Sequence, residues 1–475
     1  MDLTSFSGNV SCKAVGVLCF AGVEPLSVLE GASTRAFDLF RAKGKRGEFF
    51  RYPMEGEVQD LFLVGLGDEG KVCPSTYRNA VADLVRKVGR LGISDLAVVL
   101  PVGPDEAISS AVAEGAVLGN YRFDGYRQPK DGDISVSVDR VCLKDGVESG
   151  LARGKVLGHA QVVSRDLANR PGNDITPQTM AEEAQRIAKE GGLECVVWDE
   201  VKIQEERMSA LWHVGKGSQN PPRFIHMVYR PAGTPRKKLA FVGKGVTFDS
   251  GGLCIKGREG IRTMKCDKTG ACNVLAIMEA VSVLKPDVEV HGIVGAVENM
   301  PDGAAYRPDD IVRARNGKTI EIVNTDAEGR VTLADTLSYA SELDVDCLVD
   351  MATLTGAVAT ALGNYTAGVF SDNDELSQEI IDSGRRAGER YHRFTMDDDK
   401  LREQIDSPVA DLLNSGGAGG GAITAGMFLK EFVKAEIPWA HLDIAGVDFY
   451  DKEFDCYGKG ASSFGVRTCL EYILK

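Results

Sequence analysis

Short apolar runs alternate with stretches of helical spacing along most of this chain. In the first part, apolar runs of strand length occur at 13–20, 60–67 and 95–101, and helical spacing occurs at 76–92 and 107–119. In the second part, strands are expected at 194–198, 223–229, 238–243, 288–297, 346–352 and 439–445, and helices at 178–190, 270–285, 331–342, 374–388 and 421–435. This rhythm predicts an α/β fold whose sheet is largely parallel or mixed and is covered by helices on both faces.

The length of the chain predicts more than one domain. At 475 residues it exceeds an ordinary single domain. A helical stretch leads into the turn-rich sequence NRPGNDITP, so we expect an N-terminal α/β domain at 1–150, a linker helix at 151–169 and a larger domain at 170–475. The segment 126–139 is polar and broken, as in a rim loop or an edge strand.

Net charge and the arrangement of cysteines indicate which binding partners and which cellular compartment the protein can have. The net charge of −14 argues against a chain-wide grip on nucleic acid or an anionic membrane, although it allows a local basic patch. No segment approaches the roughly 18 unbroken apolar residues of a membrane span. The first residues lack the pattern of a secretory signal, and the 11 cysteines form no CxxC pair. We therefore expect a cytoplasmic protein with free thiols.

The sequence EIVNTDAEGR (321–330) places Asp326 and Glu328 two residues apart after an apolar run. One interpretation is structural: Asn, Asp and Gly make a turn, and a helix begins whose N-terminus favours acidic groups. If the segment is extended instead, the alternation of side chains puts both carboxylates on one side, where both can reach one ion.

Two further stretches place charged residues at similar points. In VGKGVTFDSGGLCIK (242–256), Lys244, Asp249 and Lys256 follow a predicted buried strand, which by itself suits a glycine-rich turn with surface lysines. In TMKCDKTGACNVL (263–275), Asp267 precedes an apolar helix, where it could act as an N-cap. Because ligands of such sheets gather at the carboxyl ends of strands, the three stretches together favour one shared site.

Four carboxylates at one sheet edge would repel each other unless cations compensate them, and two divalent ions would do so. Oxygen ligands suit Mg²⁺ and Mn²⁺, and Zn²⁺ is also allowed. Other chemistries fit less well: the six histidines form no HExxH, Ser250 is not in a GxSxG motif, and 414–426 lacks the GK[ST] ending of a P-loop. Cys254, Cys266 and Cys272 lack ligand-like spacing and are more typical of core residues. The sequence thus predicts a two-metal hydrolytic centre.

These motifs resemble the leucyl (cytosol) aminopeptidase family. The stretch 242–256 and the motifs MKCDKTGA, ENMPDGAAYRPDDIV (298–312), NTDAEGR and ATLTGA (352–357) stand in the family's order, and RDLANRPGNDITP (165–177), VADLLNSGGAGGGAITA (409–425), WAHLDIAG (439–446) and GASSFGVR (460–467) extend the match over 165–475. The resemblance implies a small macro-like N-terminal α/β domain and a larger catalytic domain with a mixed central sheet. It also implies a homohexamer that removes N-terminal residues from peptides.

The resemblance further implies roles for individual residues. Asp249 and Glu328 would bridge two metal ions, Lys244 and Asp267 would complete one ion's ligands, and Asp326 would bind the other ion, also through its backbone carbonyl. The ions would be Mn²⁺ or Zn²⁺, with Mg²⁺ and Co²⁺ as alternatives, and would share a hydroxide. Lys244 would ligate as a neutral amine, which requires a strongly lowered pKa. Lys256 and Arg330 would be the catalytic pair, and Arg330 would hold a bicarbonate ion. Met264, Thr353 and Gly356 would form the wall of the pocket for the first side chain. Asp267 would also contact the substrate amine.

Some residues depart from the family pattern, and two other functions stay open. Lys268 and Thr269 replace an apolar and a small residue, Ala418 replaces a frequent arginine, and Asp309 replaces a frequent glycine. One alternative function keeps the metal centre but acts on dipeptides such as cysteinylglycine. Another is a regulatory or nucleic-acid-binding role through the basic stretch RAKGKRGEFFR (41–51).

Overall fold

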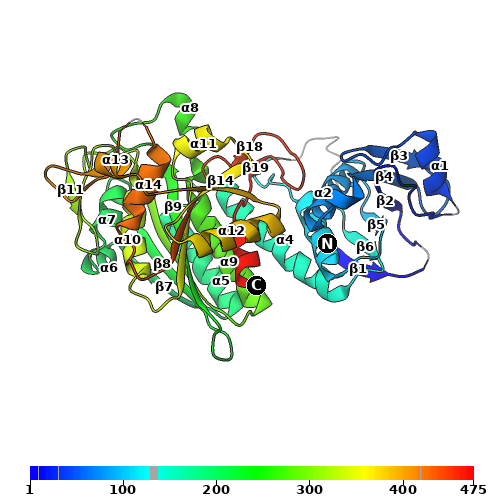
Figure 1. Cartoon of the computed structure of the whole chain (residues 1–475), viewed down its shortest axis with the longest axis horizontal. Coiled ribbons are helices and arrows are strands. Elements are labelled where there is room, and N and C mark those ends of the chain that lie inside the picture. Colours follow the sequence, from blue (N-terminus) through cyan, green and yellow to red (C-terminus); the bar gives the residue numbers. More distant parts are fainter. Residues whose placement is uncertain (9, 30, 129–136, 418) are drawn as a thin grey trace. The chain divides into compact units, whose positions relative to one another are not determined.

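The computed structural model describes the chain except residues 9, 30, 129–136 and 418 (Figure 1). The described chain forms two compact units, Met1–Val162 with Tyr450–Lys459, and Val163–Phe449 with Gly460–Lys475. The division falls within helix α4 (Glu148–Asn169). Ala418 and most of the segment 126–139 lie outside the described residues. The domain limits expected from the sequence, with a linker helix at 151–169, remain predictions.

The first unit contains a six-stranded sheet in the order β1-β6-β5-β2-β4-β3. Only β3 runs antiparallel to its neighbour, and apolar side chains pack on both faces of the sheet. Its strands are β1 (Asp2–Phe6), β2 (Ala14–Phe20), β3 (Phe49–Pro53), β4 (Asp60–Gly67), β5 (Asp95–Val99) and β6 (Arg140–Lys144), and its helices are α1 (Ala32–Leu39), η1 (Glu69–Lys71), α2 (Pro74–Arg90) and α3 (Glu106–Asn120).

The second unit is built on an eight-stranded mixed sheet in the order β15-β14-β17-β13-β9-β10-β8-β7. The four central strands run parallel, whereas β8 and β14 run antiparallel to their inner neighbours. The strands are β7 (Glu194–Trp198), β8 (Arg223–Tyr229), β9 (Lys238–Asp249), β10 (Glu289–Asn299), β13 (Cys347–Ala352), β14 (Thr366–Phe370), β15 (Arg390–Phe394) and β17 (Trp439–Asp443).

Helices cover both faces of this sheet (Figure 1). Helix α9 (Thr269–Leu284) lies against β9, β10 and β13, while α10 (Glu328–Ala340) contacts β9 and β10 through another core that includes Val331 and Leu337. The other elements are α5 (Pro177–Gly191), α6 (Glu200–Glu205), α7 (Ser209–Gly215), α8 (Arg258–Ile261), η2 (Met264–Lys268), β11 (Ile311–Arg313), β12 (Thr319–Glu321), α11 (Gly356–Leu362), α12 (Asp374–Ala387), α13 (Asp399–Arg402), η3 (Glu403–Ile405), β16 (Leu412–Leu413), α14 (Gly421–Lys430), β18 (Phe449–Tyr450), β19 (Gly460–Ala461) and α15 (Val466–Ile473).

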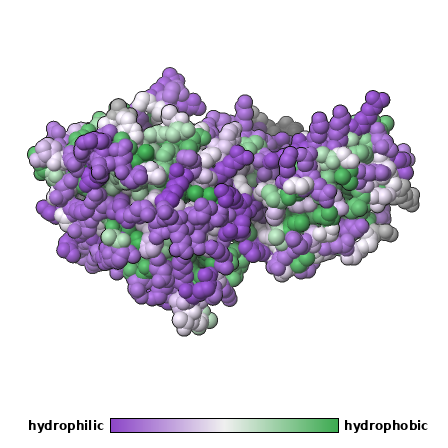
Figure 2. All heavy atoms as spheres, in the orientation of Figure 1, coloured by the Kyte–Doolittle hydropathy of each residue, from purple (hydrophilic) through white to green (hydrophobic). Residues whose placement is uncertain are grey.

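The predicted fold class is confirmed: the chain has an N-terminal α/β domain and a larger domain whose mixed sheet is covered by helices on both faces. Within the described residues, no helix combines the length and apolar character needed to cross a membrane. Hydrophilic residues cover most of the molecular face shown in Figure 2. All eleven cysteines are free thiols.

A buried polar group ties the central strands β13 and β17 together. Asp350 accepts hydrogen bonds from Trp439 Nε1 at 2.8 Å and from His441 Nδ1 at 2.6 Å. Burial lowers the pKa of His441, but the Asp350 carboxylate more than offsets this effect and holds the pKa above its ordinary value. Both groups are fully buried, so each compensates the polarity of the other.

We expect Asp350→Asn to lower the free energy of unfolding by about 3 kcal/mol, because it leaves a buried charge partner uncompensated. Chemical denaturation would measure the change. The contribution of the pair is fully present below the ordinary histidine pKa and declines as pH rises through the raised folded-state pKa, so the deficit should be largest in acid. Asp372→Asn is the control, because Asp372 forms a surface pair with Lys430 and its loss should cost less than about 1 kcal/mol. Equal effects of the two substitutions would contradict this role.

Candidate metal centre

The four carboxylates singled out in the sequence meet around two lysines. Lys244 Nζ lies 2.7 Å from Asp267 Oδ1 and 2.9 Å from Glu328 Oε1. Lys256 Nζ lies 2.8 Å from Asp249 Oδ2 and 2.6 Å from Asp326 Oδ1. Carboxylate oxygens of Asp249, Asp326 and Glu328 also lie within 4.8 Å of one another, a grouping that can hold a metal ion.

The cluster lies at the carboxyl end of β9, where elements from both faces of the sheet converge. Asp249 is the last residue of β9, Asp267 lies in η2 just before α9, and Glu328 begins α10. The extended arrangement considered for 326–328 is wrong, because Asp326 lies in a turn and Glu328 is helical. The two carboxylates nevertheless converge, because α10 begins beside the end of β9.

A glycine allows Lys244 to reach this cluster. A Cβ atom at Gly329 would lie 2.6 Å from both Cε and Nζ of Lys244. The side chain of Lys244 therefore passes directly against the first turn of α10, where only a residue without a side chain leaves enough room. This close approach places the amine between Glu328 and Asp267.

Burial and charge shift the acid–base properties of the cluster. Burial, and then repulsion from Glu328, raise the pKa of Asp249 to about 6. Burial also raises the pKa values of Asp267 and Asp326. For Lys244, burial lowers the pKa, but the surrounding carboxylates outweigh it and hold the pKa above its ordinary value. The lowered pKa expected for Lys244 is therefore not produced by the protein groups themselves, and a neutral amine would depend on an adjacent cation.

The donor set fits divalent metal ions. Two lysines face four carboxylates, so the protein cations leave negative charge uncompensated in a buried site. Asp267 Oδ2 and Glu328 Oε2 are buried oxygens with no hydrogen-bond partner among the described residues. Carboxylate oxygens without histidine suit hard or borderline cations.

The other predicted site residues occupy distinct positions. Thr353 contacts two residues of the cluster. Its backbone oxygen accepts a hydrogen bond from Lys244 Nζ at 2.9 Å, and its side-chain hydroxyl donates one to Asp267 Oδ1 at 2.8 Å. Gly356 begins α11 and faces open space, and Met264 is half-buried at the start of η2. Arg330 is buried on α10, where burial lowers its pKa to about 10, and it has no carboxylate within ion-pair distance in the described chain.

Sequence reasoning missed the residues that orient Asp249. Asn299, the last residue of β10, donates from Nδ2 to Asp249 Oδ1 at 2.8 Å and to the Thr325 backbone oxygen at 3.0 Å. Tyr306 also donates to that oxygen, at 2.7 Å. The position of Asn299 at the end of an apolar strand was the available signal, because its parallel neighbour β9 ends at Asp249.

Three departures from the family pattern have visible consequences. The Lys268 side chain is fully buried, and its ammonium donates to the backbone oxygens of Lys265, Ala168 and Arg170 rather than to the carboxylates. Thr269 is also buried and donates to the Cys266 oxygen at 2.5 Å. Asp309 is exposed with a φ of 71°, a backbone conformation that explains why glycine suits this position.

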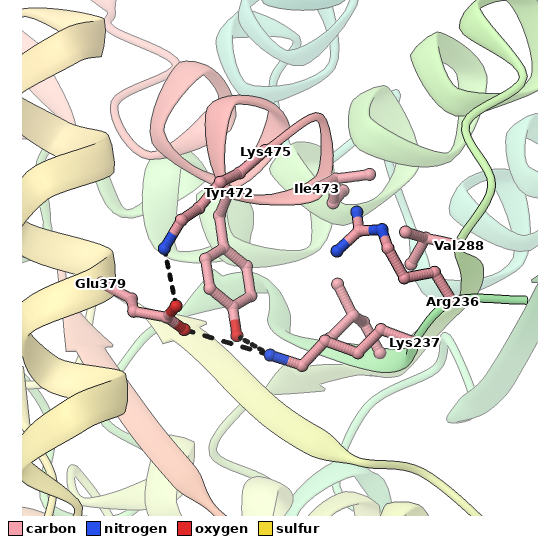
Figure 3. Close-up of a pocket in the computed structure, with 8 residues that line it drawn as sticks. Arg236, Lys237, Val288, Glu379, Tyr472, Ile473 and Lys475 are labelled. Carbon is pink, nitrogen blue, oxygen red and sulfur yellow. Dashed lines mark hydrogen bonds and ion pairs between the residues drawn. The ribbon is translucent and has the colours of Figure 1, made fainter.

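A separate pocket lies at the opposite end of β9. Figure 3 shows Lys237 and Lys475 both directed at Glu379, beside Tyr472. Its volume is about 150 Å³, and its third cation, Arg236, lies 3.5 Å from Asp287. Each cation of this pocket has a carboxylate partner, so the pocket lacks the excess of carboxylate that marks the cluster around Lys244 and Lys256.

Comparison with known proteins identifies the family. The model of the cytosol aminopeptidase family, catalytic domain, matches residues 162–470, and the model of that family's N-terminal domain matches residues 22–130. The chain belongs to the cytosol aminopeptidase family. It is therefore a hydrolase of the aminopeptidase class, as the sequence predicted.

Relatives of high similarity agree with this family. A probable cytosol aminopeptidase of Aquifex aeolicus (strain VF5) is 53% identical over 482 residues, which cover 100% of this chain and 97% of that protein. One of Persephonella marina (strain DSM 14350 / EX-H1) is 46% identical over 468 residues, with 94% and 92% covered.

Solved structures extend the comparison. The bottromycin maturation enzyme BotP in complex with Mn has a TM-score of 0.87 and 35% identity, covering 97% of this chain and 99% of that one. A mutant of tomato leucine aminopeptidase has a TM-score of 0.89 and 32% identity, covering 100% of this chain and 96% of that one.

We expect Gly329→Ala to lower kcat/KM for leucine amide by about tenfold or more, because the added methyl displaces Lys244 and small misplacements at a reacting centre are costly. Steady-state kinetics would measure the loss, and thermal unfolding would test the fold. Gly303→Ala is the matched control, since a Cβ there meets nothing within 4 Å. Unchanged kinetics in Gly329→Ala would show that the Lys244 position is not needed.

Proposed function

We propose that this aminopeptidase removes N-terminal residues, preferentially leucine and other apolar residues, from a broad range of peptides with the help of two divalent metal ions. The observation that carries the proposal is that four carboxylates outnumber two lysines in a buried cluster. Within it, Asp267 Oδ2 and Glu328 Oε2 have no hydrogen-bond partner among the described residues. We assign Lys244, Asp249, Asp267, Asp326 and Glu328 as the ligands. The role is intracellular peptide turnover.

The bound ions would supply Lewis acidity and a nucleophile at neutral pH. Mn²⁺ is the first candidate, because a structural relative of 35% identity is described in complex with Mn. Zn²⁺, Mg²⁺ and Co²⁺ are the alternatives, since the ligand set combines carboxylates with one amine.

Two cationic residues have separate roles in this proposal. Lys256, held by Asp249 and Asp326 at 2.8 and 2.6 Å, stabilises negative charge that develops on the scissile carbonyl oxygen. Arg330 stays protonated and cannot act as a base. Its buried guanidinium, with no carboxylate at ion-pair distance in the described chain, suits a bicarbonate ion that accepts and returns a proton.

The substrate is held by the groups around Asp267. The free amine of the peptide binds beside Asp267, which restricts cleavage to chain ends. Met264, Thr353 and Gly356 form the wall for the first side chain, and the open space at Gly356 allows side chains of different sizes. The family name also supports a cytoplasmic location, and we propose a homohexamer as the working assembly.

We expect Glu328→Ala and Asp326→Ala each to abolish metal-dependent hydrolysis of leucine amide, because each removes a ligand from the carboxylate group. Activity after chelation and re-addition of Mn²⁺, Zn²⁺, Mg²⁺ or Co²⁺ would identify the metal, with elemental analysis as a readout independent of activity. The surface variant Glu436→Ala should retain full metal content and activity. Wild-type turnover in either ligand variant would refute the assignment.

We expect Arg330→Ala to lower kcat by roughly 10²-fold or more, the scale of a lost proton-transfer group, while both metals stay bound. Turnover would be measured in carbonate-free buffer with and without added bicarbonate. Bicarbonate should accelerate the wild type and leave the variant unchanged. Loss of metal from the variant would instead give Arg330 a role in building the metal site.

A further inference from the structure

A second pocket lies in the first unit at the carboxyl ends of β2 and β4. Its volume is about 400 Å³. Lys45, Arg46, Asp68, Lys71 and Thr76 provide its polar lining, and we call it the basic pocket. Two of these residues, Lys45 and Arg46, belong to the basic stretch 41–51, which the metal centre does not use.

The position of the basic pocket is one that α/β sheets commonly use for ligands. The chain passes from β2 to β4 on one side, and then crosses through α2 to β5 on the other side of β2. The strand order reverses between β2 and β5, whereas the pocket lies over the ends of β2 and its other neighbour, β4. Ligands in such sheets gather outside the carboxyl ends of the strands, the edge on which the basic pocket lies.

The lining carries an excess of positive charge. Three cations face one carboxylate, although the whole chain has a net charge of −14. Lys71 pairs with Asp68 at 2.7 Å and Arg46 with Asp455 at 3.2 Å, but both pairs are exposed and therefore weak. Lys45 has no ion-pair partner in the described part of the chain. The two weak surface pairs and the unpaired Lys45 leave these cations able to turn toward a bound anion.

The loop that carries Lys45 and Arg46 is held in place by the strand ends. Gly67 N donates to Gly44 O at 2.9 Å, and Gly65 N donates to Glu48 O at 2.9 Å. A Cβ at Gly65 would lie 2.0 Å from Lys45 O, so the close contact requires glycine. Because the backbone of this loop is already fixed, binding of a ligand needs little further ordering of the backbone.

The first turn of α2 lines the same pocket. Thr76 is the third residue of this 17-residue helix and lines the cavity, and its hydroxyl accepts a hydrogen bond from Cys73 N at 3.3 Å. The amino end of a helix carries partial positive charge, which adds to the attraction for an anion. Lysine and arginine side chains beside the positive end of a helix together suit phosphate oxygens.

We propose that the basic pocket binds the phosphate group of a small phosphorylated molecule. The site lies in a different unit from the metal centre, and none of its residues belongs to the proposed ligand or catalytic set. The proposal is therefore independent of the metal chemistry.

The test is calorimetric titration of the full-length protein with inorganic phosphate, adenosine monophosphate and adenosine, at about 0.15 M salt. The phosphate-bearing probes should bind and adenosine should not. Adenosine monophosphate binding more tightly than phosphate would identify a nucleotide-like ligand, whereas equal affinity would show that the phosphate group alone is recognised. Binding by adenosine alone, or by no probe, would overturn the proposal.

Matched variants localise the binding. Lys45→Gln should weaken phosphate binding about tenfold, the effect of one charge-assisted hydrogen bond. Lys43→Gln removes the same charge from an exposed position of the same loop that does not line the pocket, and it should keep wild-type affinity. Leucine amide hydrolysis should be unchanged in both variants. Hydrogen exchange should show ligand protection in 43–48 and 66–76, and equal weakening by both variants or protection elsewhere would refute this site.

Discussion

Compensation of buried charge is the constraint on which the catalytic unit depends. Asp249, Asp267 and Glu328 are nearly inaccessible to water, and so is Lys244. A buried carboxylate without a partner costs several kcal/mol, so these residues must be held together by opposite charge. Lys244 alone connects three elements, because it extends from β9, contacts Asp267 in η2 and reaches Glu328 at the start of α10. The excess of carboxylate over lysine leaves negative charge that suits divalent cations.

The mixed sheet provides the geometry that makes such a cluster possible. Parallel pairing brings the carboxyl ends of β13, β9 and β10 to one edge, where Thr353, Asp249 and Asn299 lie in that order across the sheet. Helices on opposite faces then add Asp267 and Glu328 from the two sides. Close packing at Gly243, where a Cβ would lie 2.6 Å from Gly270 O, seats α9 on β9 and fixes the segment before it. The positions of these carboxylates therefore depend on tight backbone approaches as much as on their own side chains.

The sequence predicted the regular part of this arrangement well. The strands at 60–67, 194–198 and 223–229 agree with β4, β7 and β8, because continuous apolar runs and turn residues mark buried strands clearly. It missed β14, β15 and α15, which are only five to eight residues long and therefore give a short pattern to recognise. It also ended the strand at 243, although β9 continues to Asp249, because glycine and charged residues at the site break the apolar pattern. The carboxylates were found from their position after strands. Asn299 was overlooked although it too ends an apolar strand, whereas the role of Gly329 depends on a contact with the distant Lys244 that no local pattern reveals.

Lys268 shows how a charge next to a metal-ligand candidate can remain outside the site. Its ammonium is surrounded by the backbone oxygens of Lys265, Ala168 and Arg170, and Lys265 donates to Asn169 O at 2.8 Å. Residues 168 and 169 are the last of the 22-residue helix α4, where carbonyl groups without helical partners carry partial negative charge. The helix end therefore stabilises both lysines through several oxygens. Because Lys268 donates to backbone oxygens rather than to carboxylates, its charge leaves the carboxylate cluster unchanged. Lys268 instead fastens η2, and with it Asp267, to the end of α4.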